Sequence, residues 1–278
     1  MIPASAQTID TGTETVLAAV VDGAALITLN RPQRRNALHA DMYRAVPALL
    51  ERFAADDAVG AVVITGAGQA FCAGGDVRDG GSAKEAPAGD EEAQVAARAA
   101  LLTESARMVV LLHEIPKITI AALPGAAVGA GMSIALAADL RIAAASARLI
   151  PGWAKLAFSG DFGGAWFLSR LVGSSRALEL LIADQAIDAE AGLRLGLFNR
   201  IVDDADLPAE ALRWAAEIAS GPTAAFAATK ANIVDAQHLS IAEALPRESE
   251  RMVRSALTQE HRDAVKAWRD AAKAGSRR

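Results

Sequence analysis

The chain has 278 residues, of which 52% are hydrophobic and 22% charged, so it is long enough to bury a substantial core. Its net charge is −5 and no block of basic residues occurs, which argues against nucleic acid as a partner. Cys72 is the single cysteine, so a disulfide framework within the chain and a zinc site with several cysteine ligands are excluded, and a cytoplasmic location is expected. No apolar run reaches the ~20 residues needed to cross a membrane.

The first predicted elements are a hairpin and a helix. Residues 1–14 are polar and predict a flexible tail. Two short β-rich runs, 15–21 and 24–30, flank Asp22-Gly23, a dipeptide typical of hairpin turns. Residues 36–55 then place apolar side chains at helical spacing.

Two buried strands follow, and each leads into a loop of small residues. The apolar runs 61–65 and 117–123 are typical of parallel strands that are covered on both faces. After the first run comes Phe71-Cys72-Ala73-Gly74-Gly75-Asp76-Val77. After the second comes Val128-Gly129-Ala130-Gly131-Met132, which opens a predicted helix over 129–138. A long helix is predicted between the two loops, over 91–113.

Strands and helices alternate as far as residue 202, and only helices are predicted after 206. This order indicates an α/β core with a helical C-terminal region. The expected organisation is a tail over 1–14, a core over 15–205 and a helical oligomerisation region over 206–278.

Neither small-residue loop contains a nucleophile beside a base. Both can instead present bare backbone N–H groups, which stabilise a developing oxyanion. A single loop of this kind usually serves only to turn the chain, but two of them after two buried strands favour an anion site. A dinucleotide loop fits less well, because Phe71 stands where the third glycine of the pattern is needed.

Together with these loops, several motifs resemble the crotonase (enoyl-CoA hydratase/isomerase) superfamily over about residues 16–266. They are Leu29-Asn30-Arg31-Pro32, Asn36-Ala37-Leu38, Asp139-Leu140-Arg141-Ile142-Ala143 and the run 191–202. The resemblance implies an α/β crotonase-like spiral of repeated ββα units with C-terminal helices. It further implies a homotrimer or homohexamer, an acyl-CoA thioester substrate, and no cofactor beyond the coenzyme A that the substrate carries.

The resemblance also implies where the substrate binds. The amides of Ala73 and Ala130 would hold the thioester oxygen, and Cys72, Gly74 and Gly129 would lie beside it. Arg34 and Arg35 would meet the phosphates of coenzyme A, with Lys230 as a weaker candidate; solvated loop arginines are nearly as good an interpretation. No metal site is expected, because His39, His238 and His261 lack ligand spacing and His113 ends a predicted helix.

The acids depart from the hydratase pattern, in which two glutamates handle the water. Ser133 and Trp153 stand at those two positions. Asp161 remains, among glycines and aromatic residues, where a carboxylate suits proton transfer. Because it precedes a predicted helix, an N-cap role is equally compatible with the residues alone.

Resemblance to the ring-epoxide phenylacetyl-CoA isomerases favours the catalytic role of Asp161. Trp153 and Asp161 also match a tryptophan and a nucleophilic aspartate of chlorobenzoyl-CoA dehalogenase, but Ala106 stands in place of its histidine base. The sequence therefore predicts an enoyl-CoA isomerase with Asp161 as the proton shuttle. The alternatives are a hydratase with a reduced set of acids, and a non-catalytic acyl-CoA-binding subunit.

Overall fold

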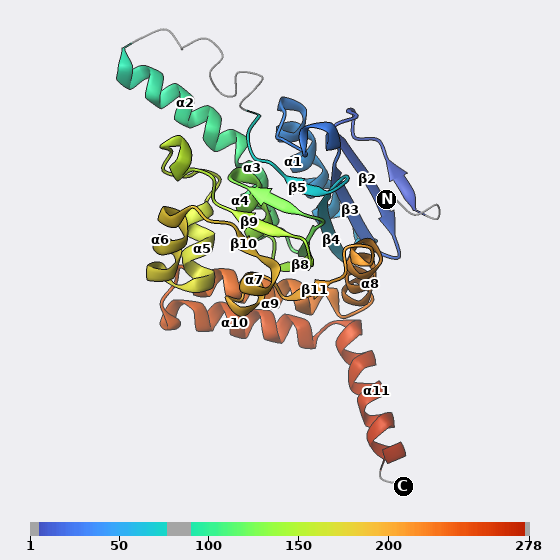
Figure 1. The fold of residues 1–278 in the computed structure, drawn as a ribbon. Helices are drawn as coiled ribbons and strands as arrows, with labels where there is room; N and C mark the ends of the chain where they lie inside the picture. The colour runs from blue at the N-terminus through green and yellow to red at the C-terminus, as the bar shows by residue number, and fades with distance from the viewer. Residues whose placement is uncertain (1–5, 77–89, 276–278) are drawn as a thin grey trace.

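The computed structural model describes residues 6–76 and 90–275, and two sheets form its centre (Figure 1). The larger sheet has seven strands in the order β1-β2-β3-β4-β6-β8-β11, and the smaller has four in the order β10-β9-β7-β5. The strands are β1 (Gln7–Ile9), β2 (Val16–Val21), β3 (Ala24–Leu29), β4 (Ala61–Gly66), β5 (Ala70–Cys72), β6 (Ile118–Leu123), β7 (Ala126–Val128), β8 (Leu140–Ala144), β9 (Arg148–Ile150), β10 (Ile187–Asp188) and β11 (Arg200–Val202).

The predicted hairpin is confirmed. Strands β2 and β3 pair in antiparallel fashion, and Val21 lies opposite Ala24 across Asp22 and Gly23, which both have positive φ. The flexible tail expected over 1–14 is wrong for Gln7–Ile9, because this short segment pairs with β2 as an edge strand. Its side chains are mostly exposed, so hydropathy gave no sign of it.

The buried strands are confirmed as well, since β3, β4, β6, β8 and β11 are parallel neighbours. After β4, β6 and β8 the chain enters the second sheet as β5, β7 and β9 and then returns as a helix. This repeated strand-strand-helix unit is the ββα spiral that the sequence predicts. It places the two small-residue loops side by side, because β5 and β7 are parallel neighbours.

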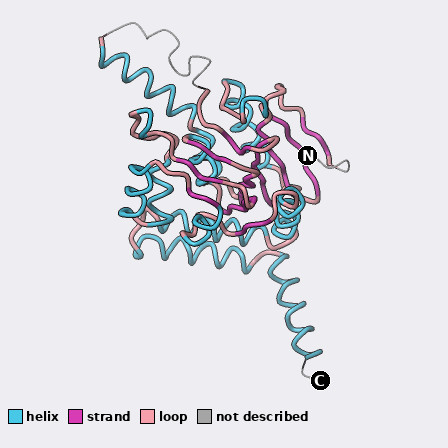
Figure 2. Tube along the Cα trace, viewed as in Figure 1, coloured by secondary structure: helices cyan, strands magenta, loops and turns pink. Residues whose placement is uncertain are grey.

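Helices surround the sheets (Figure 2). They are α1 (Ala40–Ala55), α2 (Glu91–Ser105), α3 (Arg107–Glu114), α4 (Ala130–Ala137), α5 (Gly164–Val172), α6 (Ser174–Ala183), α7 (Ala189–Arg194), α8 (Leu207–Ala219), α9 (Thr223–Ala236), α10 (Ile241–Ala256) and α11 (Gln259–Gly275). The helix predicted over 91–113 is divided at Ala106: α3 buries three apolar side chains, whereas α2 buries none.

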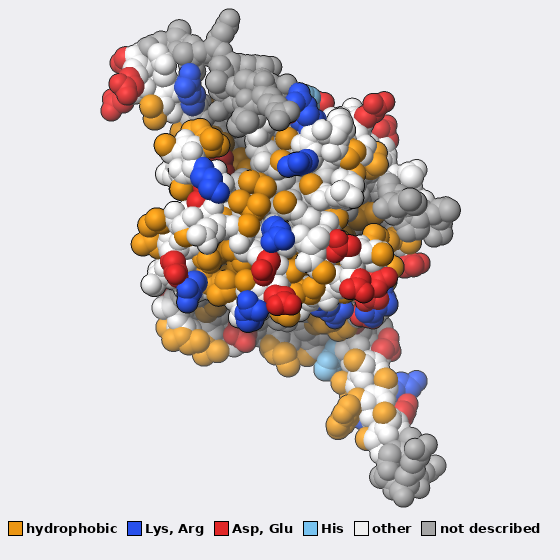
Figure 3. All heavy atoms as spheres, viewed as in Figure 1, with side chains coloured by type: hydrophobic (Ala, Val, Ile, Leu, Met, Phe, Trp, Pro, Cys, Tyr) orange, Lys and Arg blue, Asp and Glu red, His pale blue; other side chains and the backbone are white. Residues whose placement is uncertain are grey.

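The C-terminal helices do not form one unit. Leu207, Ala211, Trp214 and Ala215 of α8 are buried against the sheet, so the core continues beyond the boundary expected at 206. In contrast, α10 buries no side chain, and α11 projects from the body (Figures 1 and 3). Large apolar side chains are exposed on both helices, including Met252 and Trp268. Among the described residues, no helix has the length and apolar character to span a membrane.

Candidate active site

The two small-residue loops touch each other through glycine. A Cβ atom on Gly74 would lie 2.8 Å from the carbonyl oxygen of Val128 and 3.6 Å from the amide nitrogen of Ala130. A Cβ atom on Gly131 would lie 2.3 Å from the carbonyl oxygen of Cys72. Backbone therefore packs directly on backbone, which glycine alone permits. The two small-residue loops are therefore in direct contact.

The amide of Ala130 is suited to hold an anion. Ala130 is the first residue of α4, so its N–H has no acceptor within the helix and lies at the positive end of the helix dipole. Gly129 caps the helix with a φ of 55°, a left-handed conformation that turns the chain from β7 into α4. All eight residues of α4 are buried, which holds this amide in place.

The amide of Ala73 is not suited to that role, and the sequence-based assignment is wrong in this respect. Its N–H donates a 3.0 Å hydrogen bond to the carbonyl oxygen of Arg35. The backbone of Gly74 hydrogen-bonds the Cys72 sulfur. Gly75 follows, is exposed, and has no atom within 4 Å of a Cβ built on it. The backbone of the first loop is therefore exposed at Gly75, two residues after the expected position at Ala73.

The segment 30–38 anchors this loop. Arg31 forms a 3.0 Å ion pair with Asp76 and donates to the Ala37 carbonyl. Buried Asn36 accepts from the Arg31 amide and donates to the carbonyls of Ala67 and Ala70. These buried polar partners went unnoticed in the sequence, although Asn36 and Arg31 lie in the motifs that carry the family resemblance.

Arg34 and Arg35 lie in the same segment, beside the first loop. The side chain of Arg35 is exposed and that of Arg34 is partly so, and the carbonyl of Arg35 is the acceptor for Ala73. Val77, the last residue of the first motif, lies outside the described residues.

Cys72 is fully buried, and burial raises the pKa of its thiol to about 12. A thiol with that pKa remains protonated at neutral pH, so it offers no nucleophile. It forms the buried start of the first loop, where its backbone packs against Gly131.

Asp161 faces Trp153. The indole Nε1 of Trp153 donates a 3.0 Å hydrogen bond to Oδ1 of Asp161. Burial raises the pKa of the Asp161 carboxyl, and the Trp153 hydrogen bond opposes that shift in part. The N-cap interpretation is wrong, because α5 begins at Gly164, Gly163 is its N-cap, and no side chain caps it.

Trp153 connects this carboxylate to the second loop. A Cβ atom on Gly129 would lie 3.7 Å from the indole Nε1, and one on Gly164 would lie 2.6 Å from the far edge of the ring. Ser133 is fully buried on α4 and donates from Oγ to the carbonyl oxygen of Asp161 at 3.1 Å. Ser133, Trp153 and Asp161 are thus brought together beside Ala130.

Asp184 holds the turn that carries Trp153, a role that no sequence motif indicates. Its side chain is 2% exposed. One carboxylate oxygen accepts from the Gly152 amide and the other from the Lys155 amide at 2.9 Å. These two bonds clamp both sides of Trp153, so Asp184 positions the indole.

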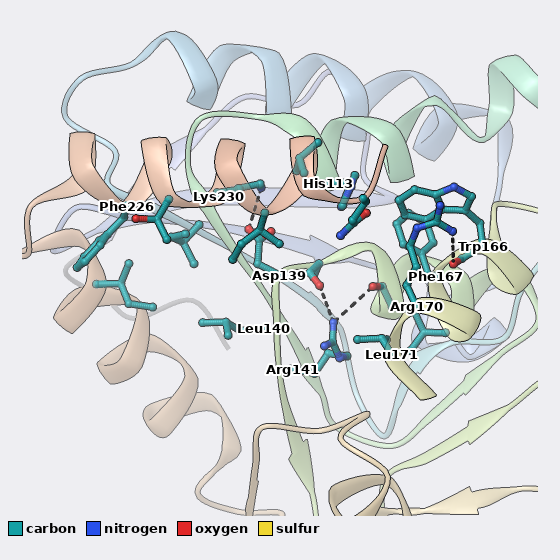
Figure 4. A pocket seen from close by; sticks show the side chains of 18 of the residues that line it. His113, Asp139, Leu140, Arg141, Trp166, Phe167, Arg170, Leu171, Phe226 and Lys230 are labelled. Carbon is teal, nitrogen blue, oxygen red and sulfur yellow. Dashed lines mark hydrogen bonds and ion pairs between the residues drawn. The ribbon is translucent and has the colours of Figure 1, made fainter. Parts of the chain in front are cut away.

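A cavity of about 510 Å³ lies at the other end of α4 (Figure 4). Leu136, Ala138, Trp166 and Phe167 line it, whereas Ala130 and Asp161 do not. At its wall Lys230 is buried, pairs with Asp139 at 2.8 Å and donates to the carbonyls of Leu112 and Lys117. Lys230 therefore joins α9 to the core, and its suggested contact with phosphate is wrong.

The raised pKa of Asp161 predicts an effect on stability. Folding disfavours the charged carboxylate, so its ionisation destabilises the folded protein above the folded-state pKa and has no such effect below about pH 4. We expect Asp161→Asn to be more stable than the wild type at pH 7, with the difference shrinking as the pH falls to 4. Urea denaturation at both pH values measures it. A variant that is less stable at pH 7 would show that the carboxylate is structural.

Comparison with known proteins agrees with this architecture. The pattern of the enoyl-CoA hydratase/isomerase family matches residues 20–274. A "probable enoyl-CoA hydratase" of Rhodobacter capsulatus is 36% identical over 84% of each chain. The 1,2-epoxyphenylacetyl-CoA isomerase of Escherichia coli is 31% identical over 92% of this chain and 95% of its own. A solved structure of an enoyl-CoA hydratase from Thermobifida fusca, in complex with acetoacetyl-CoA, is 30% identical and superposes with a TM-score of 0.77. The match covers 87% of this chain and 95% of that one. The chain therefore belongs to the enoyl-CoA hydratase/isomerase family, the crotonase superfamily, and is an acyl-CoA enzyme of that family.

Proposed function

We propose that the protein is an enoyl-CoA isomerase that moves a double bond through an enolate. The observation that carries this proposal is one backbone amide without an acceptor in its helix, that of Ala130, together with one carboxylate, that of Asp161. Ser133 and Trp153 occupy the two positions of the hydratase glutamates. A single carboxylate can take a proton from one carbon and return it to another. Addition of water normally requires two acid–base groups.

The proposed reaction begins with a 3-enoyl thioester. Asp161 removes a proton from the α-carbon, and the electron pair moves onto the thioester oxygen as a dienolate. The electrons return as the protonated Asp161 gives its proton to the γ-carbon, which leaves the double bond between the α- and β-carbons. Trp153 occupies Oδ1 of Asp161, so Oδ2 is the oxygen assigned to the proton. The raised pKa makes this carboxylate a stronger base than an exposed one.

The oxyanion would be held by two amides. One is Ala130, and Gly75 replaces Ala73 as the donor from the first loop, because Ala73 is bonded to Arg35 and Gly74 faces Cys72. Each such donor contributes ~3 kcal/mol or more to transition-state stabilisation. Gly74 and Gly129 let the loops approach, and Arg34 and Arg35 are assigned to the phosphates of coenzyme A because they border the first loop.

A hydratase with one acid is the second candidate, favoured by the hydratase name of the Rhodobacter capsulatus relative. The two reactions differ in mass: isomerisation leaves the thioester unchanged in mass, whereas hydration adds one water. A binding subunit would leave both 2-enoyl- and 3-enoyl-CoA unchanged and would exchange no substrate proton with deuterated water.

Removal of the carboxylate should abolish isomerisation. Asp161→Asn keeps the size of the side chain but cannot take a proton, so kcat should fall on the order of a hundredfold or more while acyl-CoA still binds. The assay is conversion of 3-enoyl-CoA followed by absorbance, with mass spectrometry of the product. Asp188→Asn is the matched control, because Asp188 is a true N-cap of α7 and accepts from the Ala191 amide. Full turnover by Asp161→Asn would exclude Asp161 as the shuttle.

Removal of the Ala130 donor should also abolish turnover. Ala130→Pro deletes the N–H at the first position of a helix, where proline fits the backbone. Ala40→Pro deletes the equivalent N–H of α1 and is the matched control. We expect loss of more than a hundredfold in kcat for the first variant only. Circular dichroism checks that both variants fold, and activity in a folded Ala130→Pro would contradict the oxyanion assignment.

We also propose, from the family resemblance, assembly into a trimer or hexamer through the C-terminal helices. Exposed apolar side chains on α10, including Leu245, Met252 and Val253, provide the contact surface. Sedimentation at micromolar concentration should give three or six times the chain mass of 28.7 kDa. The double substitution Met252→Glu and Val253→Glu should lower that mass, and a wild-type monomer would contradict the assembly.

A further inference from the structure

Tyr43 is the only tyrosine of the chain, and it lies at the candidate active site. It stands in the first turn of α1, beside the segment that anchors the first loop. Its ring packs against the core and against Phe162, with ring centroids 6.2 Å apart and planes tilted by 41°. Because Phe162 directly follows Asp161, this contact brings Tyr43 close to the segment that carries the carboxylate assigned to proton transfer.

The surroundings of the hydroxyl come from both halves of the site. The groups that act electrostatically on it are Cys72, Asp161 and Asp76. Cys72 and Asp76 belong to the first loop, and Asp161 belongs to the segment before α5. These two parts of the chain come together at the candidate site. Phe162, whose ring contacts that of Tyr43, is itself buried.

The hydroxyl is a donor without a partner among the residues that the structure describes. No hydrogen bond joins it to any of them. The hydroxyl oxygen is not fully buried, so it retains contact with solvent. Burial of the ring, with the three neighbouring groups, raises the pKa of Tyr43 to about 12. The phenol therefore stays protonated and neutral near pH 7.

We propose that the Tyr43 hydroxyl is a specificity-determining hydrogen-bond donor of the acyl site, which selects acyl groups that carry an oxygen acceptor beyond the thioester carbonyl. This inference depends on the acyl-CoA site proposed above. When an acyl chain fills that site, the hydroxyl loses its water. An oxygen in the chain replaces the lost hydrogen bond, whereas a methylene leaves the donor unpaired. Sites built around such a donor reject ligands that lack its partner.

An oxygen scan tests this. The probes are hexanoyl-CoA and its three analogues in which oxygen replaces the methylene at C3, C4 or C5; none has a double bond, so binding is measured without turnover. Isothermal titration gives Kd for the wild type, Tyr43→Phe and Tyr43→Leu. Tyr43→Phe removes the hydroxyl and keeps the ring, whereas Tyr43→Leu also removes the contact with Phe162.

In the wild type, at least one oxygen analogue should bind about tenfold more tightly than hexanoyl-CoA. Tyr43→Phe should abolish that preference by tightening the binding of hexanoyl-CoA, because no donor is then left unpaired, while Tyr43→Leu should bind all four ligands more weakly than Tyr43→Phe. The inference is overturned if Tyr43→Phe keeps the preference, if no preference exists, or if Tyr43→Phe weakens all ligands alike, as it would if the phenol only oriented Asp161. Absence of binding by every thioester would instead refute the acyl-CoA site itself.

Discussion

The contact of Gly131 with Cys72 sets the geometry on which the site depends. Any side chain at Gly131 would meet the carbonyl oxygen and the Cβ atom of Cys72, so a larger residue would push α4 away from β5. Gly74 repeats the constraint from the opposite loop, against Val128. Because Gly131 and Gly74 have no side chains, the N-terminus of α4 and the exposed turn at Gly75 can lie close together. The scarcity of aromatic residues, 4% of the chain, is consistent with a core built from such close approaches.

The aspartate side of the site is built separately. Trp153 donates to Asp161, and Asp184 accepts from the backbone amides on either side of Trp153; none of these three residues lies in either small-residue loop. The two parts meet where Trp153 lies against Gly129 and where Ser133 bonds the Asp161 carbonyl. The proposed oxyanion amides and the proposed proton shuttle can therefore be altered independently, apart from that narrow contact.

Local pattern was sufficient for much of the fold, because the parallel strands are continuous apolar runs and the hairpin turn is Asp-Gly. Local pattern was insufficient where a contact with a distant part of the chain determines the role of a residue. Whether the Ala73 amide is free depends on a carbonyl of Arg35, 38 positions earlier in the chain, and no local signal shows that. The same holds for Asp161: its neighbours suit a helix cap, but the left-handed φ of Phe162 and Gly163 carries the chain past it before α5 begins. Strand β1 could not be predicted, because an exposed edge strand does not require alternating apolar and polar residues.

Ser133 is fully buried, and its Oγ would lie 2.8 Å from a Cβ atom on Gly164. The far edge of the Trp153 ring lies 2.6 Å from that same Cβ position. A glutamate at position 133 would have no volume to occupy until Trp153 became smaller, and replacement of Trp153 first would remove the hydrogen bond to Asp161. An evolutionary path from this arrangement to a two-glutamate site therefore passes through an intermediate that is impaired in packing or in catalysis. Such epistasis would make a tryptophan–aspartate site and a two-glutamate site difficult to interconvert by single substitutions.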